Sequence, residues 1–559
     1  MTDVASLRPI AAVLVSVVAI PLILGSRGRP NLREAWTMLA ALAKLAIVGS
    51  MVPGVLSGTV YVTDLGTMVA DISFTLRVDA LGLLFGLLAS ALWVVTSLYS
   101  IGYMRGLSEH NQTRYFASFA ASLATAIGVA FASNLVTLFI FYELLTVATY
   151  PLVAHDEDDE ARAAGRKYLA YTFIGGVAVL TGTVLVYFLV GTTTFTAGGI
   201  AGLATADPAL ARLAFALLAG GFGVKAALMP VHSWLPDAMV APTPVSGLLH
   251  AVAVVKSGVF GIARVTLDVF GPDAVQDLGM GLPLAAVAAF TLLTASVIAL
   301  RQDNLKRRLA YSTISQLSYI VLGLGVLSSD AIVGGLLHIP AHAFMKLTLF
   351  FCAGAIHVET HTDDISKMAG IGKRMPLTMT AFAIAAAGMA GIPLVAGFVS
   401  KWYLLIGSVD AGQAVFAIAL LVSGMLNIAY FWPIVYQAFF ESADDHDSKP
   451  LLESPFGGRF AEQDATKSVR ADGGEHDVAT DHDAVDHHDG TSEHDAHHHG
   501  GPPEGGWERA GWRGGESTWF MLGPILTAAA GALAIGVVPA TFLFLRIVQL
   551  IAENVGVMA

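Results

Sequence analysis

Ionisable side chains stand in the middle of several apolar stretches of this chain. Glu143 lies within Thr137-Leu-Phe-Ile-Phe-Tyr-Glu-Leu-Leu, and Lys256 lies within Val252-Ala-Val-Val-Lys-Ser-Gly. A charge at the centre of a bilayer costs about 3 kcal/mol or more, so an ionisable residue inside a membrane segment indicates a functional site. Burial penalises the charged form of both residue types, which makes them suited to exchanging protons.

Two further lysines lie beside breaks in long hydrophobic segments. The segment 209–240 is interrupted at Met229-Pro230, shortly after Lys225, and the segment 376–407 is interrupted at Gly391-Ile-Pro, shortly before Lys401. Both segments are far longer than the roughly 20 residues that span a bilayer. Lipid cannot satisfy the backbone groups at such a break, which must therefore lie in protein or water. The two matched breaks predict a charge pathway through the membrane.

His338, His342 and Lys346 follow one another at intervals of four residues. On a helix this spacing places all three side chains in one polar stripe. A lone membrane histidine is more often a satisfied structural group. Two histidines and a lysine in line, followed by Lys401 in the next segment, favour a proton wire, because imidazole both accepts and donates protons near neutral pH.

These residues together predict a central polar axis that transfers protons. Glu143 and Lys225, if side by side, would each favour the charged form of the other, and such a pair could act as a switch or as a static ion pair. The predicted axis contains Glu143, Lys225, Lys256, His338, His342, Lys346 and Lys401.

Three residues near the axis have predicted supporting roles. His232 and Asp237 flank the first break, where they could hold the unwound segment by side-chain hydrogen bonds or take part in transport. His250 precedes Lys256 by six residues in the same apolar stretch.

The composition identifies the chain as a membrane protein. Of its 559 residues 55% are hydrophobic and 13% are charged. We expect an all-α polytopic fold with fourteen membrane spans and retention of the first as a helix. The spans are expected at 7–25, 35–57, 78–101, 113–132, 134–153, 168–191, 209–240 (broken), 244–265, 280–300, 308–328, 331–356, 376–407 (broken), 411–439 and 518–548.

Cofactors are not expected in this chain. Its single cysteine, Cys352, excludes an internal disulfide and a cysteine-ligated zinc or iron–sulfur centre built within the chain. The sequence also has no glycine-rich fingerprint for a flavin or a nucleotide, and nothing in it indicates nucleic acid as a partner.

An acidic, histidine-rich segment separates the last two spans. The formal net charge of −12 arises from residues 441–500, so the membrane body is nearly neutral. Without apolar periodicity, 441–517 is expected to be disordered. His482, His487 and His488 are weak candidates for binding a divalent metal, and a solvated acidic linker is the alternative.

The basic residues outside this segment sort by side of the membrane. Because Lys/Arg-rich loops stay cytoplasmic, both termini are expected on the outer side of the cell membrane and 441–517 in the cytoplasm. The residues assigned to the basic face are Arg27, Arg29, Arg33, Arg105, Arg114, Arg162, Arg166, Lys167, Arg301, Lys306, Arg307, Arg308, Lys367, Lys373 and Arg374.

Spans four to eight and nine to thirteen form two blocks of five, each with its broken helix fourth. Five is odd, so consecutive blocks insert in opposite orientations, which is the inverted-repeat architecture of ion-coupled transporters. The expected organisation is three N-terminal helices (1–112), a first repeat (113–265), a second repeat (279–439), the insert (441–517) and a C-terminal transmembrane helix (518–559).

Several motifs resemble one family of membrane proteins. They are Lys225-Ala-Ala-Leu-Met-Pro-Val-His-Ser-Trp-Leu-Pro-Asp-Ala, Ala241-Pro-Thr-Pro-Val-Ser-Gly-Leu-Leu-His with Lys256, His338-Ile-Pro-Ala-His-Ala-Phe-Met-Lys, and Gly391-Ile-Pro-Leu-Val-Ala-Gly-Phe-Val-Ser-Lys-Trp. Over about 78–440 the chain is similar to the proton-conducting antiporter-like subunits of respiratory complex I, membrane-bound hydrogenases and Mrp-type cation/proton antiporters.

The resemblance implies fourteen helices, two inverted five-helix repeats and proton transfer along a central polar axis. It makes Glu143 and Lys225 the coupled glutamate–lysine pair, Lys256 the relay lysine and Lys401 the terminal residue of a half-channel. Pro376-Leu-Thr-Met-Thr-Ala-Phe and the Ser-Lys-Trp-Tyr ending look most like the D-type subunit of Mrp antiporters. The complex I subunit that otherwise resembles this chain usually has glutamate where Lys401 stands.

The first functional hypothesis is a proton-translocating subunit of a multisubunit Na⁺/H⁺ antiporter, without covalent chemistry of its own. Its partners would be other membrane subunits, H⁺, and Na⁺ or K⁺. The alternative is an antiporter-like pump module of a complex I-like NADH-quinone oxidoreductase or a membrane-bound hydrogenase, with electrons handled by other chains. Weaker alternatives are an energising component of inorganic-carbon accumulation and a self-sufficient transporter.

Overall fold

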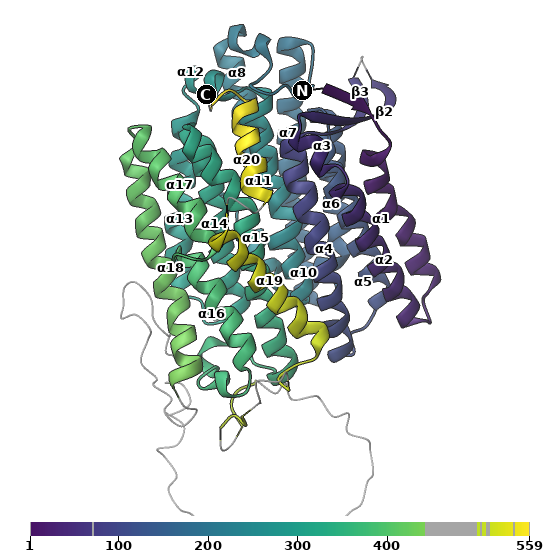
Figure 1. The fold of residues 1–559 in the computed structure, drawn as a ribbon, viewed down its shortest axis with the longest axis vertical. Helices are drawn as coiled ribbons and strands as arrows, with labels where there is room; N and C mark the ends of the chain where they lie inside the picture. The colour runs from purple at the N-terminus through teal and green to yellow at the C-terminus, as the bar shows by residue number, and fades with distance from the viewer. Residues whose placement is uncertain are drawn as a thin grey trace, which may run out of the picture.

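A bundle of long helices makes up the chain in the computed structural model, which describes residues 2–69, 72–441, 500–503, 506–509, 515–539 and 543–557. Within this part, 13 helices are long and apolar enough to cross a membrane (Figure 1). The first eight α-helices are α1 (Arg8–Gly25), α2 (Pro30–Gly49), α3 (Val52–Leu56), α4 (Ala80–Gly106), α5 (Gln112–Phe131), α6 (Leu135–Val153), α7 (Asp159–Val190) and α8 (Pro208–Lys225).

Short and irregular turns occupy the middle of the chain, where the first break was predicted. Helix α8 ends at Lys225, and a continuous apolar segment resumes at Thr243. The elements of this region are η1 (Ala201–Thr205), α9 (Trp234–Asp237), η2 (Ala238–Val240), α10 (Thr243–Gly247), the π-helix η3 (Leu248–Val252), α11 (Val254–Arg264), the π-helix η4 (Val265–Val269) and α12 (Pro272–Asp277).

The second block contains the other broken helix. Neither of its halves, α16 (Pro376–Ala390) and α17 (Ala396–Asp410), is long enough to span a membrane alone, and together they occupy the predicted broken span 376–407. The remaining elements are α13 (Gly281–Leu300), α14 (Leu305–Val326), α15 (Ser329–Thr360), η5 (Ile365–Lys367), η6 (Ile371–Lys373), α16 (Pro376–Ala390), α17 (Ala396–Asp410), α18 (Ala414–Phe440), α19 (Trp519–Val537) and α20 (Leu543–Asn554).

Glycine and proline explain the second break. Gly391 ends α16 in a left-handed conformation with φ of 92°, which a residue without Cβ adopts at little cost. Pro393 follows two residues later and cannot continue the hydrogen-bonded helix. At the other end of α16, the Glu516 carboxylate accepts from the backbone N–H groups of Leu377 and Thr378, at 3.0 and 3.1 Å.

The all-α prediction is confirmed for the membrane-spanning part, but it missed a small sheet at one end of the bundle. Strands β1 (Thr2–Ala5), β2 (Thr59–Val69) and β3 (Ile72–Val78) form it in the order β1-β2-β3, with β1 parallel and β3 antiparallel to β2. The end of β3 was included in the start of a predicted span. Val, Ile and Phe favour strands as well as apolar helices, which made this assignment ambiguous.

The C-terminal span differs from its predicted form. One helix was expected over 518–548, whereas the structure has α19 and then α20. Pro539, just after α19, has no backbone N–H to donate and clashes with the preceding turn, so α19 does not continue. Helix α19 packs on α4, α15, α16 and α17, and therefore contacts both the N-terminal helices and the second block.

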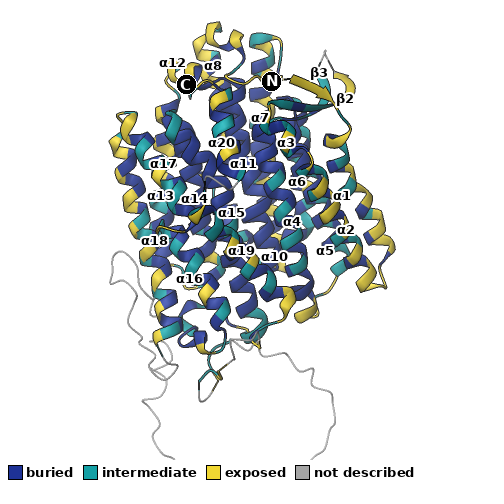
Figure 2. Ribbon diagram, viewed as in Figure 1, coloured by how far each residue is buried: buried dark blue, intermediate teal, exposed yellow. Residues whose placement is uncertain are grey.

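The core of the bundle lies along α11, α14 and α15 (Figure 2). Every residue of 243–269 is buried, which explains why this segment is hydrophobic on all sides. Helices α1, α7, α13 and α18 expose large apolar side chains such as Ile174, Phe188 and Phe440. Exposed apolar surface over the length of a helix is what a lipid environment requires.

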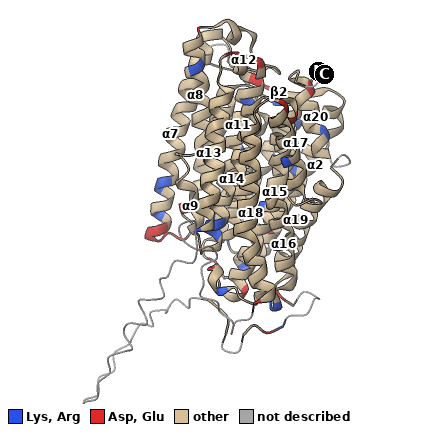
Figure 3. Ribbon diagram, turned by 90° about the vertical axis from the view of Figure 1, so that its left-hand side faces the viewer, with Lys and Arg blue, Asp and Glu red and all other residues tan. Residues whose placement is uncertain are grey.

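The loops predicted to carry the basic residues meet at one end of the bundle. Arg105 pairs with Glu34, Arg33 donates to Gln112 at 2.7 Å, and Arg114 pairs with Glu157. Elements β1 and α20 lie at the opposite end, so both chain ends are on the same side (Figure 1). Most charged residues lie near the two ends, with few in the middle (Figure 3).

The helices of the two five-helix blocks pack on one another in a corresponding order. In the first, α5 packs on α6 and α7 packs on α8; in the second, α13 packs on α14 and α15 packs on both α16 and α17. The inverted relation between the blocks stays a prediction. The insert 441–517 lies mostly outside the described residues, as do His482, His487 and His488.

Candidate functional site

The predicted histidine stripe lies in the core and joins the two halves of the molecule. Lys256 of α11 is 2.8 Å from His342 of α15, measured from Nζ to Nδ1, and both side chains are fully buried. His342 Nε2 has no hydrogen-bond partner among the described residues. The rings of His342 and His338 are 6.1 Å apart between centroids, one helical turn along the same face.

Polar residues from two other helices bond His338, and a residue of a third helix bonds one of them. Its Nδ1 lies 2.8 Å from the Ser400 hydroxyl of α17, and its Nε2 lies 3.0 Å from Oε1 of Gln316 of α14. Because this amide oxygen only accepts, Nε2 carries the hydrogen. In the neutral ring Nδ1 then accepts from the Ser400 hydroxyl, which also lies 3.2 Å from the Gly397 carbonyl. Gln316 in turn donates to Asn427 of α18 at 3.2 Å. The neutral imidazole is thereby held in one tautomer.

Sequence reasoning missed Ser400, Asn427 and Tyr319 as parts of this site. Asn427 donates to the Tyr319 hydroxyl at 3.5 Å, and the Tyr319 ring stacks on His338 with centroids 5.4 Å apart. Single polar or tyrosine residues are common in apolar helices, so the positions of these three residues in the sequence gave no signal for their contacts with His338 or Gln316.

Lys401 folds back over the second break. Its Nζ donates to the carbonyl of Met389, in the last turn of α16, at 2.5 Å. It also lies 4.7 Å from the centroid of the Tyr319 ring, and its side chain passes over Gly391. The lysine thus donates a hydrogen bond to a carbonyl in the last turn of the broken helix, where backbone carbonyls lack partners within the helix. Tyr319 contacts both this lysine and His338.

Lys346 lies further along α15 on the same stripe. Its Nζ donates to the Ser312 hydroxyl at 2.6 Å and to the Leu309 carbonyl at 3.1 Å, both on α14. It is fully buried, and no hydrogen bond joins it to His342 among the described residues. The structure therefore places it at the end of the stripe, one turn beyond His342.

Glu143 and Lys225 are neighbours without a direct ion pair among the described residues. Lys225 Nζ donates to the carbonyl of Tyr142, the residue before Glu143, at 2.5 Å and lies 3.4 Å from the centroid of the Tyr142 ring. Glu143 Oε1 is buried without a hydrogen-bond partner in this part of the chain and faces Gly176 of α7.

A close approach of helices links this pair to the histidine stripe. A Cβ at Gly258 of α11 would lie 2.3 Å from the backbone nitrogen of Ala226, directly after Lys225. Gly258 is two residues beyond Lys256 on the same helix. The end of α8 therefore packs on the turn of α11 that carries Lys256, although no hydrogen bond joins the two lysines among the described residues.

The predicted supporting residues lie in three different surroundings. Asp237 bonds Lys167 of α7 at 2.5 Å, at the basic end of the bundle. His232 has its ring 6.4 Å from that of Tyr311, and its Nδ1 has no hydrogen-bond partner among the described residues. His250 lies in the π-helix η3 against Phe350, with ring centroids 4.8 Å apart.

Other residues hold the unwound segment after α8. Trp234 Nε1 donates to the Val224 carbonyl at 2.8 Å, and Ser233 donates to the Tyr171 hydroxyl at 2.9 Å. The backbone N–H of Met229 donates to the Thr291 hydroxyl at 3.1 Å. These bonds satisfy polar groups that a membrane would leave unpaired.

A polar cavity of about 480 Å³ opens at the basic end, next to this segment. Its lining residues include Pro236, Asp237 and Val240, which follow the break, and Lys167 and Asp156 from the neighbouring helix and loop. Water in this cavity would reach the base of the unwound segment.

Two other buried charges lie away from the stripe. Lys44 is fully buried, donates to the Leu123 carbonyl at 2.8 Å and lies 4.8 Å from the Trp93 ring centroid. Arg264 forms two ion pairs of 2.7 Å, with Asp79 and Asp268. Both are satisfied by fixed partners, so burial of a charge alone does not identify the site.

Comparison with known proteins confirms the resemblance. The family described as "NADH:quinone oxidoreductase/Mrp antiporter, TM" matches residues 132–427. NADH-quinone oxidoreductase subunit N of Desulforudis audaxviator is 34% identical over 371 residues, which cover 65% of this chain and 72% of that protein. The A-type component of the Na(+)/H(+) antiporter of Alkalihalophilus pseudofirmus is 37% identical over 348 residues, which cover 59% of this chain.

The chain spans less than half of some of these relatives. It covers 42% of the Alkalihalophilus protein and 40% of the A/B component of the probable K(+)/H(+) antiporter of Rhizobium meliloti, to which it is 34% identical over 72% of its own length.

Two solved structures share the fold over nearly the whole chain. A chain of the Mrp complex from Dietzia sp. DQ12-45-1b superimposes with a TM-score of 0.76 at 23% identity and covers 98% of both chains. A chain of the archaeal membrane-bound sulfane sulfur reductase gives 0.74 at 22% identity and covers 99% of this chain. With the family match extending over more than half of its length, this chain belongs to the NADH:quinone oxidoreductase/Mrp antiporter transmembrane family.

Proposed function

We propose that this chain is a proton-translocating membrane subunit of a multisubunit monovalent cation/proton antiporter, equivalent to the D-type subunit of Mrp complexes. Family membership and the buried polar stripe support the proton-conducting role. The Ser-Lys-Trp-Tyr ending around Lys401 supports the choice of host complex.

The contact between Lys256 and His342 carries the proposal. An ammonium group has no lone pair, so a hydrogen bond of 2.8 Å between these two nitrogens requires one of them to be in its neutral form. One nitrogen therefore donates a hydrogen to the other, and both belong to groups that can gain and lose a proton. Two titratable side chains in hydrogen-bond contact, buried between two helices, are the arrangement that a relay requires.

Glu143, Lys225 and Lys401 complete the proposed pathway. Protonation of Glu143 would remove the negative charge nearest Lys225 and so favour loss of the Lys225 proton toward Lys256. The cavity beside Asp237 would supply water-borne protons at the basic end. Waters would bridge the separation between Lys225 and Lys256 and the separation between the two histidine rings.

The proposal extends to partners and location. Other membrane subunits of the complex would supply the oxygen ligands for Na⁺ or K⁺, since the stripe is built mainly from cationic and imidazole groups. We place the protein in the cell membrane with both termini outside and 441–517 in the cytoplasm, because the basic loops gather at one end.

Glu143→Gln and Lys225→Ala test the function in membrane vesicles that contain the assembled complex. Each substitution should reduce cation-dependent proton transport at least about tenfold, as expected for a residue required in the transfer path. Lys44→Met is the matched control for Lys225, because Lys44 is equally buried but bonds a fixed carbonyl off the stripe. Assembly is checked by co-purification of the other subunits. Normal transport by Glu143→Gln or Lys225→Ala would contradict the proposal.

The second candidate is a proton-pumping subunit of a complex I-like oxidoreductase. The 34% identity to a subunit N over 72% of its length favours it. Purification from the native membrane in mild detergent distinguishes these two candidate functions. Small membrane subunits alone would support the antiporter, and co-purifying flavin or iron–sulfur subunits would support the oxidoreductase.

A further inference from the structure

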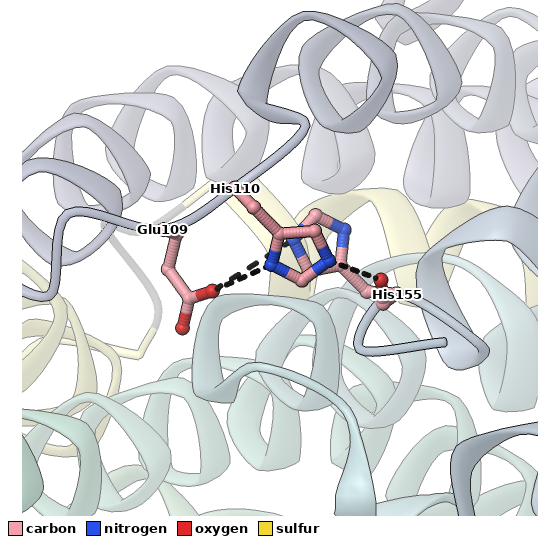
Figure 4. A group of neighbouring side chains, drawn as sticks. All are labelled: Glu109, His110 and His155. Carbon is pink, nitrogen blue, oxygen red and sulfur yellow. Dashed lines mark hydrogen bonds and ion pairs between the residues drawn. The ribbon is translucent and has the colours of Figure 1, made fainter. Parts of the chain in front are cut away.

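Three potential metal ligands meet at the basic end of the bundle, away from the polar stripe (Figure 4). Glu109 and His110 lie in the loop between α4 and α5, and His155 lies just after α6. Glu109 Oε2 is 3.7 Å from His110 Nδ1 and 4.0 Å from His155 Nε2. All three ligand atoms lie within 4.8 Å of one another.

A backbone contact orients His110 toward this group. Its Nε2 donates to the carbonyl of His155 at 3.0 Å, which fixes the hydrogen on Nε2. The lone pair of Nδ1 then points to the side of Glu109. Histidines that bind metals typically donate their other ring N–H to a backbone carbonyl or a carboxylate in this way.

His155 is an unpartnered imidazole in a buried position. Its side chain is completely buried, and neither ring nitrogen has a hydrogen-bond partner among the described residues. An unsatisfied buried polar group costs about 1–3 kcal/mol, and a bound ion would remove this cost.

We propose that Glu109, His110 and His155 bind a divalent transition metal ion of the Zn²⁺ class, with a fourth position open to water. Two imidazoles and one carboxylate suit such ions, which take these ligands at about 2.0–2.2 Å. Tetrahedral binding would bring the ligand atoms to roughly 3.3 Å from one another. The two distances from Glu109 would have to shorten by less than about 1 Å to reach this geometry, and the distance between the two histidine nitrogens, at most 4.8 Å, by up to about 1.5 Å.

The bound ion would join two loops that are distant in sequence. His110 and His155 are 45 residues apart, and Asp156, the next residue, lines the polar cavity at this end. The metal would therefore fix the loop after α6 beside that cavity. This site is separate from the proposed proton path, and its test does not depend on transport.

The test uses the full-length protein with the nine histidines of 441–500 replaced by serine, because a histidine-rich segment binds metal on its own. Bound Zn²⁺ is measured by equilibrium dialysis, and Co²⁺ is added separately to read the ligand field by visible absorption. One tightly bound ion per chain is expected, with the absorption of four-coordinate Co²⁺.

Glu109→Gln and His155→Gln should each weaken Zn²⁺ binding at least about tenfold and abolish the four-coordinate Co²⁺ spectrum. His357→Gln is the matched control, because His357 lies at the same end but bonds Asp363 at 3.0 Å. Glu109 is partly exposed, so its variant should fold even if the His155 variant does not. Absence of a tight ion in the parent protein, or equal binding by Glu109→Gln and His357→Gln, would overturn the proposal.

Discussion

At the scale of single residues, the hydrogen-bond partner of a buried lysine indicates its role better than its burial does. Lys44, Lys225 and Lys401 all donate to backbone carbonyls, which cannot accept a proton permanently. Lys256 instead bonds His342, a second titratable group. The sequence marks Lys225 and Lys401 by the breaks beside them, but only the structure shows that Lys256 contacts another titratable side chain.

Gln316 gives a prediction about a residue that cannot titrate. Gln316→Leu removes the acceptor of His338 Nε2–H, which leaves a buried donor unpaired at a cost of about 1–3 kcal/mol. Because the histidine tautomer is no longer fixed, proton transport in vesicles should fall about tenfold while the complex still assembles. Ser90→Ala is the control, since the Ser90 hydroxyl bonds the Gly86 carbonyl of its own helix. Equal rates for the two variants would contradict the relay role of His338.

The candidate site was partly predictable at this scale. The stripe of His338, His342 and Lys346 follows from a spacing of four on one helix, so it can be recognised without a structure. Ser400 and Asn427 reach the site from other helices, and a single sequence contains no distance between helices. The cluster of Glu109, His110 and His155 was missed for the same reason.

At the scale of elements, hydropathy predicted the spans well and the irregular parts less well. A membrane span can be recognised from the length of one continuous run of apolar residues, and the thirteen long helices were predicted in this way. The β1–β3 sheet depends on pairing between segments that lie far apart in the chain, such as Thr2 with Thr59, which hydropathy does not record. The π-helical turns η3 and η4 depend on packing against neighbouring helices.

Gly258 tests the contact between α8 and α11. In Gly258→Ala the new Cβ would lie 2.3 Å from the Ala226 nitrogen, so one helix must shift. We expect a loss of about 1–3 kcal/mol in stability, measured as a lower unfolding temperature in detergent, and slower proton transport. Gly220→Ala in α8 meets nothing within 4 Å and should leave stability unchanged or raise it by up to about 1 kcal/mol. Equal unfolding temperatures would show that the close approach is absent.

At the scale of the whole molecule, the ends of the bundle differ in charge. The ion pairs of Arg105, Arg114 and Lys167 all gather at the end opposite the β1–β3 sheet. Since basic loops are retained on the cytoplasmic side, this asymmetry sets the orientation that we propose. The same end carries the polar cavity and the proposed metal site.

The single native cysteine makes this orientation testable. Cys352 is fully buried and donates to the Thr378 carbonyl, so the parent protein should not react with a membrane-impermeant thiol reagent. Thr205→Cys, in η1 near the sheet end, should be labelled in intact cells. Glu160→Cys, at the basic end, should be labelled only in inverted vesicles. The reverse pattern would show that the protein has the opposite orientation.

The central claim is that protons cross between the two blocks through the contact of Lys256 with His342. The most direct measurement is proton flux in vesicles containing the assembled complex, compared among the parent protein, Lys256→Met and Lys44→Met. We expect flux to fall at least about tenfold in Lys256→Met and to stay near the parent rate in Lys44→Met, because Lys256 bonds a titratable side chain whereas Lys44 bonds a carbonyl. Equal flux in Lys256→Met and the parent, with both complexes assembled, would contradict it.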